Sequence, residues 1–290
     1  MKQSLFILVV NETVVRSPVF FLGAPHSGVD LVAHAVQRSP GFHITTDEPT
    51  VLRSAHALAR RPSIAAERGV GSAHLLREAL AEAWQLTPHT CRQCSRYGID
   101  PRAVTCRHGQ LTQRFGDASP DLLYSAQTLA AAFDDALFVQ VIRDGRDVVA
   151  SMLGDEGVLE TLRPGGGTTE GDLPNPYLGV DTADERERYS RMSHPERCAL
   201  RWRGAVRLSA QLRAYLPTER LLTLRYEEVV GAESETAERL TEFVAGTVSA
   251  PDLLGATADG IGSWRHRLTS SQQADVLRTV GTELGRLGYR

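Results

Sequence analysis

The sequence predicts an α/β fold of three layers, in which helices cover both faces of a central, mainly parallel sheet. Apolar runs typical of strands alternate with helical segments along the chain. Two of these runs lead directly into helices: residues 19–22 precede a loop with glycine at both ends, and residues 137–142 end at Arg143. Such alternation is typical of parallel sheets, which bind ligands at the carboxyl ends of their strands.

The remaining segments fit the same alternation of strands and helices. Residues 154–195 are long and polar, which is typical of a lid or a disordered excursion. We interpret the chain as one domain over residues 1–290, with insertions at 51–115 and 154–195 that cover an acceptor pocket. The other expected elements are helices at 51–86 (interrupted near 61–63 and 69–71), 121–133, 199–215 and 232–244, and a strand at 221–224.

Composition limits the classes of partner. The chain has 290 residues, of which 42% are hydrophobic, and this is enough for one large α/β core. A formal charge of −3 and the lack of a basic stripe argue against a nucleic-acid partner, so we expect a small molecule. The apolar run at 5–10 is too short for a signal peptide or a membrane span, so we expect a cytoplasmic protein. The sequence leaves the oligomeric state open, and a homodimer is compatible with it.

The junction after residue 142 carries the strongest functional signal. Arg143 stands at the carboxyl end of a predicted buried strand, and Asp144 and Asp147 suit the start of the following helix. Ser151 follows Arg143 by eight residues, so that a guanidinium and a hydroxyl could close on one phosphate. The alternative is an ordinary junction between a strand and a helix, with charged residues on its surface.

A glycine loop precedes the first long helix. Gly23 and Gly28 bracket a turn whose N–H groups can face a phosphate at the helix N-terminus, as in P-loop-like folds. The spacing matches a Walker A loop, but that motif needs Lys and then Ser or Thr after the second glycine. This chain has Val29 and Asp30 there, which argues against a kinase or NTPase.

These motifs resemble those of sulfotransferases that use 3′-phosphoadenosine-5′-phosphosulfate (PAPS). Their 5′-phosphosulfate loop is typically Gly-x-Pro-Arg-Ser-Gly-Thr-Thr, and an arginine followed eight residues later by serine holds the 3′-phosphate. Further segments in the same order resemble the family's motifs: 39–42 with 47–49, 116–120, 224–229, 260–265 and 287–289.

The resemblance implies a sulfuryl transfer from PAPS to a hydroxyl or amine of a small-molecule acceptor, leaving the nucleotide PAP. Glu48 is the candidate base, and His26 is the candidate group that stabilises the leaving phosphate. Ordinary packing or solvent contact is the alternative for each of these residues. The residues implied to bind the nucleotide are Gly23, Ala24, Pro25, His26, Ser27, Gly28, Val29 and Asp30 in the loop, with Arg143, Ser151, Tyr226, Trp264 and Arg265 around the 3′-phosphate and adenine.

Several positions depart from the family pattern. His26 replaces the loop arginine or lysine, Val29 and Asp30 replace the two threonines, and Ala118 stands where a lysine is frequent. A carboxylate at Asp30 would repel a bound phosphate, although an acid in the first turn of a helix is also stabilising by itself. The second hypothesis is therefore an altered protein of sulfotransferase fold, which binds a nucleotide or a partner or uses another donor.

Three cysteines and a histidine form a separate cluster. Cys91 and Cys94, followed by Cys106 and His108, could provide a closed tetrahedral zinc site, with His89 as an alternative fourth ligand. Reduced thiols or a disulfide are the other readings of this segment.

Overall fold

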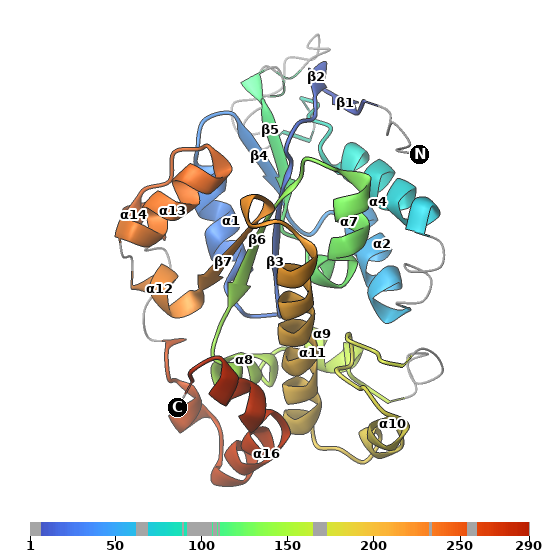
Figure 1. Ribbon diagram of the computed structural model, residues 1–290, viewed down its shortest axis with the longest axis vertical. Helices are drawn as coiled ribbons and strands as arrows, with labels where there is room; N and C mark the ends of the chain where they lie inside the picture. The colour runs from blue at the N-terminus through green and yellow to red at the C-terminus, as the bar shows by residue number, and fades with distance from the viewer. Residues whose placement is uncertain are drawn as a thin grey trace.

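The molecule is built on a sheet of five parallel strands in the order β4-β5-β3-β6-β7. The computed structural model describes residues 7–61, 69–88, 90–91, 106, 109, 111–164, 173–231, 234–253 and 260–289. The strands are β3 (Val19–Gly23), β4 (Phe42–Thr45), β5 (Arg114–Asp117), β6 (Leu137–Ile142) and β7 (Leu221–Arg225). Figure 1 shows helices on both faces of this sheet, which confirms the predicted α/β fold.

The helices form two layers and a third group beyond the strand ends. One layer contains α1 (Val29–Gln37), α12 (Tyr226–Val230), α13 (Ser234–Val244) and α14 (Ala250–Leu253). The other contains α2 (Pro49–Arg60), α4 (Gly69–Ala83), η1 (Leu122–Ser125), α7 (Ala126–Ala132) and α11 (His194–Tyr215). At the carboxyl end of the sheet lie α8 (Gly145–Met152), α9 (Glu156–Thr161), α10 (Ala183–Tyr189), α15 (Trp264–Arg267) and α16 (Ser270–Arg286). A hairpin of β1 (Val9–Val10) and β2 (Thr13–Val14) and the short η2 (Thr218–Arg220) complete the described elements.

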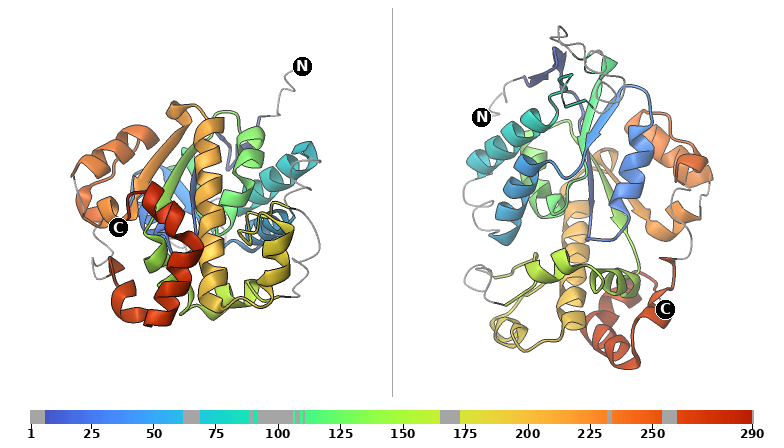
Figure 2. Two further views of the ribbon diagram at one scale, coloured as in Figure 1. Left: turned by 60° about the horizontal axis from the view of Figure 1, so that its bottom comes forward. Right: turned by 180° about the vertical axis from the view of Figure 1, so that it is seen from behind.

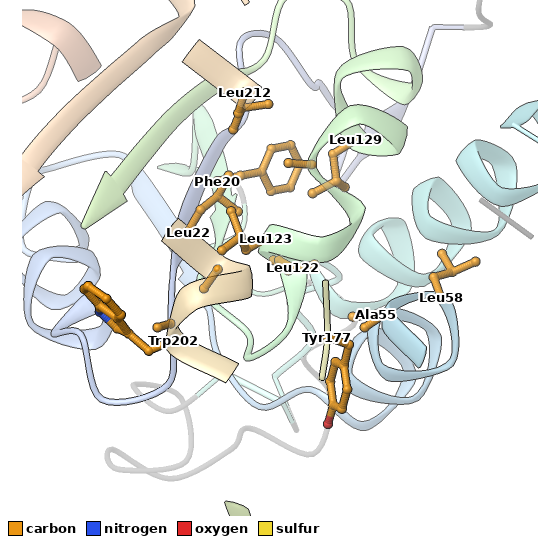
Figure 3. Packing of buried hydrophobic residues seen from close by; sticks show 14 of the residues in the cluster. Phe20, Leu22, Ala55, Leu58, Leu122, Leu123, Leu129, Tyr177, Trp202 and Leu212 are labelled. Atoms are coloured by element: carbon orange, nitrogen blue, oxygen red, sulfur yellow. The ribbon is translucent and has the colours of Figure 1, made fainter. Parts of the chain in front are cut away.

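Strand β3 divides the hydrophobic core in two because successive side chains of a strand point to opposite faces. Phe20 and Leu22 belong to the cluster formed with α2, α4, α7 and α11, whereas Val19 and Phe21 belong to the cluster formed with α1 and α13. Figure 3 shows Phe20 packed toward Leu129 and Leu22 near Leu123. A strand that is buried on both faces needs a continuous apolar run, and residues 19–22 supply one.

The long helix α11 connects the core to the C-terminal helix. It begins with a capping box, in which Ser193 and Glu196 bond to each other's main-chain N–H groups. Helix α16 begins in the same way at Thr269 and Gln272, and the two helices lie side by side (Figure 2). Each start therefore has its own local hydrogen bonds before any tertiary packing is considered.

The interpretation of residues 154–195 as a long loop is wrong for the part of the segment that is described. It contains α9, whose N-cap is Asp155, and α10, whose N-cap is Thr182. Tyr177 and Tyr189 are buried in the core cluster, so the segment is anchored by aromatic side chains despite its polar composition.

The described helices of the region 51–115 form a core layer. The expected pair of helices is present as α2 and α4, although α4 begins at Gly69, where we expected an interruption. Leu58, Leu76 and Leu80 from these helices are buried against the sheet. No helix in the described residues is long and apolar enough to cross a membrane.

Candidate functional site

The loop between β3 and α1 requires glycine at both ends. A Cβ atom on Gly23 would lie 2.3 Å from Ser27 Oγ and 2.9 Å from the carbonyl oxygen of Val141. Gly28 has a φ of +90°, and a Cβ atom there would lie 2.4 Å from the ring of Tyr226. The loop is therefore tightly closed against β6 and Tyr226. Its hydroxyl residue, Ser27, is 2% exposed, and its Oγ has no hydrogen-bond partner among the described residues.

His26 lies in this loop and is held at two points. Its main chain has a φ of +62°, and its carbonyl accepts a hydrogen bond of 2.9 Å from Arg143 Nη1. Its ring Nε2 lies 3.0 Å from Asp155 Oδ2. Both side chains are about one-third exposed, with values of 33% and 37%. The histidine is therefore fixed between the end of β6 and the start of α9.

Sequence reasoning missed Asp155. Its Oδ1 accepts a hydrogen bond of 3.1 Å from the Val158 N–H at the start of α9. This bond, followed by the contact with His26, holds the pKa of the Asp155 carboxyl below its ordinary value. The N-cap position could have been recognised from Asp before a short helix, but its partner is 129 residues away in sequence.

Arg143 ends β6, as predicted, and connects separate parts of the site. It is 7% exposed and donates hydrogen bonds to the carbonyl oxygens of His26 (2.9 Å) and Gly260 (2.8 Å). Its guanidinium lies 4.2 Å from the centre of the Tyr226 ring. Its Nε is buried and has no partner in the described part of the chain. Two of the three nitrogens thus already bind the protein.

Ser151 lies in α8, about two turns after Arg143, and its hydroxyl accepts a hydrogen bond of 3.2 Å from Arg267 Nη1. Arg267 also donates to the Ala150 carbonyl at 2.9 Å. A second exposed arginine, Arg265, lies 4.6 Å from the ring of Trp264. Cationic side chains therefore gather around the last turns of α8.

Asp147, which the sequence suggested only as a helix-start acid, organises the segment that contains Trp264. Its carboxylate accepts hydrogen bonds from Gly262 N (2.7 Å), Ser263 Oγ (3.1 Å) and Trp264 N (2.9 Å). The side chain is 99% buried, at 1% exposure. Three donors satisfy this buried charge, so α8 and α15 are joined at a fixed position.

A pocket of about 480 Å³ lies beside the loop, at the carboxyl ends of β3, β4 and β5. Residues from the segment 154–195 line it, including Asp155 and Tyr177, whereas no described residue of 51–115 does. The loop contributes Gly23, Ala24, Pro25, His26, Val29 and Asp30, and the departures from the family pattern at His26, Val29, Asp30 and Ala118 all face this pocket.

One wall of the pocket contains a buried ion pair between Arg201 and Asp121. Arg201 is 2% exposed, donates to the Tyr177 carbonyl at 2.7 Å and lies 3.3 Å from the centre of that tyrosine's ring. Burial by itself would raise the pKa of the Asp121 carboxyl, but Arg201 and His56 together hold it below its ordinary value. Both charges of this pair are therefore present at neutral pH.

Glu48, the predicted base, is exposed at the N-cap of α2. It lines a second cavity of about 810 Å³ together with His43 and Cys91, whereas its neighbour Asp47 lines the pocket beside the loop. Burial lowers the pKa of His43 to about 4.

The predicted zinc ligands are only partly described. Cys91 and Cys106 are buried, while Cys94, His108 and the alternative ligand His89 lie outside the described residues. Within the residues that are described, no group of three or more potential ligands gathers. The zinc site stays a prediction.

Comparisons with known proteins give similar solved structures and one matching family model. No curated protein matches the sequence. Similar solved structures include a sulfotransferase from Alicyclobacillus acidocaldarius (16% identity, 92% of this chain and 95% of that chain, TM-score 0.43). They also include the sulfotransferase domain of the Synechococcus PCC 7002 olefin synthase (15% identity, 91% of this chain and 93% of that chain, TM-score 0.46). A third is mouse sulfotransferase SULT7A1 complexed with PAP (12% identity, 93% of this chain and 87% of that chain, TM-score 0.43).

The family model described as "Sulfotransferase family" matches residues 18–159, which include the glycine loop, most of the residues that line the pocket beside it, and the Arg143 junction. The motifs at 224–229, 260–265 and 287–289 lie outside the matched segment. Over residues 18–159, the chain matches the sulfotransferase family.

Proposed function

We propose that this protein transfers a sulfuryl group from PAPS to a hydroxyl or amine of a small-molecule acceptor. One observation carries the proposal. Ser27 is buried in a glycine loop at the N-terminus of α1, and its hydroxyl has no hydrogen-bond partner among the described residues. A buried polar atom without a partner is costly, and a phosphate oxygen at the helix N-terminus would satisfy it.

The other residues of the loop fit the same ligand. The main-chain N–H groups in the first turn of α1 have no intrahelical acceptor and would bind the 5′-phosphosulfate together with Ser27. When bound, PAPS supplies the sulfuryl group: its sulfur–oxygen bond to phosphate breaks, a bond from sulfur to the acceptor heteroatom forms, and the acceptor's proton passes to a base. His26 would stabilise charge on the departing phosphate. Glu48 stays the proposed base, although it lines the second cavity and not the pocket that His26 lines.

The far end of the nucleotide would lie near α8 and α15. Arg143 offers its unpartnered Nε, and Ser151 offers its hydroxyl, to the 3′-phosphate. Tyr226 would border the adenine, and Trp264 with Arg265 would cover the same side. Arg265 is exposed, and its guanidinium, which lies against the Trp264 ring, has no hydrogen bond or ion pair with a described residue, so it could turn toward an anion.

A second function has its own supporting observation. Asp30 is exposed and lines the pocket in the first turn of α1, where a bound phosphate would meet its negative charge. An altered protein of this fold, which binds a different nucleotide or a partner, would have no such conflict.

Isothermal titration with PAP distinguishes the two functions. We expect the wild-type protein to bind PAP and Ser27→Ala to bind it about tenfold more weakly, because a hydrogen bond to a charged group contributes roughly 1.5–3 kcal/mol. Folding should be unaffected, since Ser27 Oγ bonds to no described residue. Ser125→Ala is the matched control: this serine is 1% exposed, its Oγ is also unpartnered, and it lies in η1 outside the pocket.

Equal PAP affinity of Ser27→Ala and Ser125→Ala would contradict the proposed phosphate contact. Absence of binding to the wild type at high micromolar PAP would favour the altered protein. Arg143→Ala is a less direct test, because Arg143 also holds the loop through the His26 carbonyl and its loss would disturb the site in either case.

A further inference from the structure

The pocket beside the loop is rich in carboxylates. Four aspartates line it, against one arginine and two histidines: Asp30, Asp47, Asp121 and Asp155, with Arg201, His26 and His34. The chain has only one lysine, Lys2, and no lysine is among the residues that line the pocket. An anionic group alone would be a poor occupant of such a cavity.

Two of the four carboxylates are already matched by the protein. Asp121 pairs with Arg201, and Asp155 with the ring of His26. Asp30 and Asp47 are both exposed, and neither has a hydrogen bond or ion pair with another described residue. These two carboxylates are the groups for which a ligand can provide the counter-charge.

A third polar group lines the same cavity. Ser119 is 3% exposed, and its buried Oγ forms no hydrogen bond of good geometry with a described residue, although it lies near the Asp117 carboxyl and works against the rise in the pKa of that group. A serine hydroxyl that turns its O–H toward a carboxylate keeps two lone pairs, which can accept a hydrogen bond from an N–H group. The position of Ser119 beside Asp117 therefore favours a ligand with a hydrogen-bond donor.

Much of the remaining lining is apolar. Phe21, Leu122, Leu123 and Val158 contribute to it, so one part of the ligand must be hydrophobic. A cavity of about 480 Å³ can hold a molecule with one aromatic ring and a short chain.

We propose that this pocket binds a primary amine with an apolar body, whose ammonium group is held by Asp30, Asp47 and Ser119. Its binding does not rest on the proposed function, but its role as the sulfuryl acceptor does. For that role the bound ammonium must first lose a proton to a base, because only the neutral amine has a lone pair that can form a bond to sulfur. The assignment also explains Asp30: the carboxylate that is unfavourable for the donor phosphate is favourable for a cationic acceptor.

Binding of simple probes tests this assignment without nucleotide. Isothermal titration with 2-phenylethylamine is compared with 2-phenylethanol, which replaces the ammonium by a hydroxyl. We expect the amine to bind at least tenfold more tightly at pH 7. Asp30→Asn and Asp47→Asn should each weaken amine binding about threefold to tenfold and leave the alcohol unchanged.

Asp184→Asn is the matched control for net charge, because Asp184 is exposed in α10 and does not line the pocket. It should bind the amine like the wild type. Equal affinity for amine and alcohol, or amine binding that neither pocket substitution weakens, would overturn the assignment.

A PAP titration of the same variants separates this assignment from the proposed function. Asp30→Asn should bind PAP more tightly than the wild type, because a repulsive charge is removed, while it binds the amine more weakly. If the amine binds with the expected dependence on Asp30 and PAP does not bind at all, the amine site stands and the sulfuryl transfer fails. If PAP binds and the amine does not, the amine site alone is overturned.

Discussion

His26 is fixed by groups from two distant parts of the chain. Arg143 bonds to its carbonyl, Asp155 bonds to its ring, and its main chain is in the left-handed region, with a φ of +62°. That conformation costs roughly 1–2 kcal/mol at a residue other than glycine. The two contacts offset this cost and direct the imidazole into the pocket beside the loop.

We predict that His26→Arg binds PAP more tightly than the wild type. Arginine restores at this position the permanent positive charge of the family's loop arginine or lysine. The gain in affinity should be roughly threefold to tenfold, the effect of one charge near a phosphate at a solvent-accessible site.

Isothermal titration of both proteins with PAP under the same conditions measures this difference. Equal affinities would mean that a cation at position 26 does not contribute to binding of the nucleotide.

At the scale of residues, the sequence was sufficient to predict the loop and its departures from the family pattern. His26, Asp30 and Ala118 were identified from motif positions, and all three line one pocket. Asp155 and Arg201 were not identified, because their roles come from partners 129 and 80 residues away. No local pattern encodes such contacts.

Neighbouring strands β4 and β5 carry two buried groups with opposite titration behaviour. Asp117 is fully buried, and burial raises the pKa of its carboxyl to about 6, against the hydrogen bonds from Thr45 Oγ1 (2.5 Å) and Ser119 N (2.7 Å). Burial lowers the pKa of the His43 ring to about 4. Each group therefore prefers its neutral form in the folded protein.

The two groups have opposite effects on stability between pH 4 and 6. Folded Asp117 keeps a proton that the unfolded chain has lost, so its contribution falls as pH rises through this range, by roughly 3 kcal/mol. Folded His43 lacks a proton that the unfolded chain binds, so its contribution rises by a similar, order-of-magnitude amount. In the wild type the two contributions largely cancel.

We predict that single substitutions expose each contribution. Between pH 4.5 and pH 6, the free energy of unfolding of Asp117→Asn should rise by about 2 kcal/mol relative to that of the wild type, because only the His43 contribution remains. Over the same range, the free energy of unfolding of His43→Phe should fall by about 2 kcal/mol relative to that of the wild type, because only the Asp117 contribution remains. Urea unfolding at both pH values measures the change, and each variant serves as the control for the other. Changes of the same sign in both variants would contradict the assignment.

At the scale of elements, the apolar strands at 19–22, 137–142 and 221–224 and the long helix α11 were predicted, since continuous apolar runs and helical periodicity encode them. The C-terminal helix α16 was not among the expected elements. The helices α9 and α10 were not predicted either. Each has six or seven residues, and their caps, Asp155 and Thr182, lie in a polar segment without a clear apolar period. The burial of Tyr177 and Tyr189 depends on the surface that α11 offers, which is a tertiary property.

At the scale of the molecule, Trp202 joins the halves of the chain. Its indole N–H donates to the Arg143 carbonyl at 3.1 Å, and its ring packs on Gly145, where a Cβ atom would lie 2.7 Å away. The contact places α11 directly against the junction of β6 and α8. The pairing of these elements could not be read from sequence, because Gly145 and Trp202 are 57 positions apart.

We predict that Gly145→Ala destabilises the protein by about 1–3 kcal/mol, since an overpacked rigid contact must shift. Gly281→Ala is the matched control: no atom lies within 4 Å of a Cβ at this position in α16. It should stabilise the protein by about 0.5–1 kcal/mol through helix propensity. Thermal and urea unfolding measure both effects, and destabilisation by Gly281→Ala of the same size would contradict the steric explanation.

The packing of Tyr226 against Gly28 has a consequence for the order of events during synthesis. The ribosome releases the glycine loop and Arg143 long before it has made Tyr226, so the nascent chain lacks the ring on which both of them rest. The packing around the glycine loop is therefore completed late in vectorial folding, after the strand preceding Tyr226 has joined the sheet.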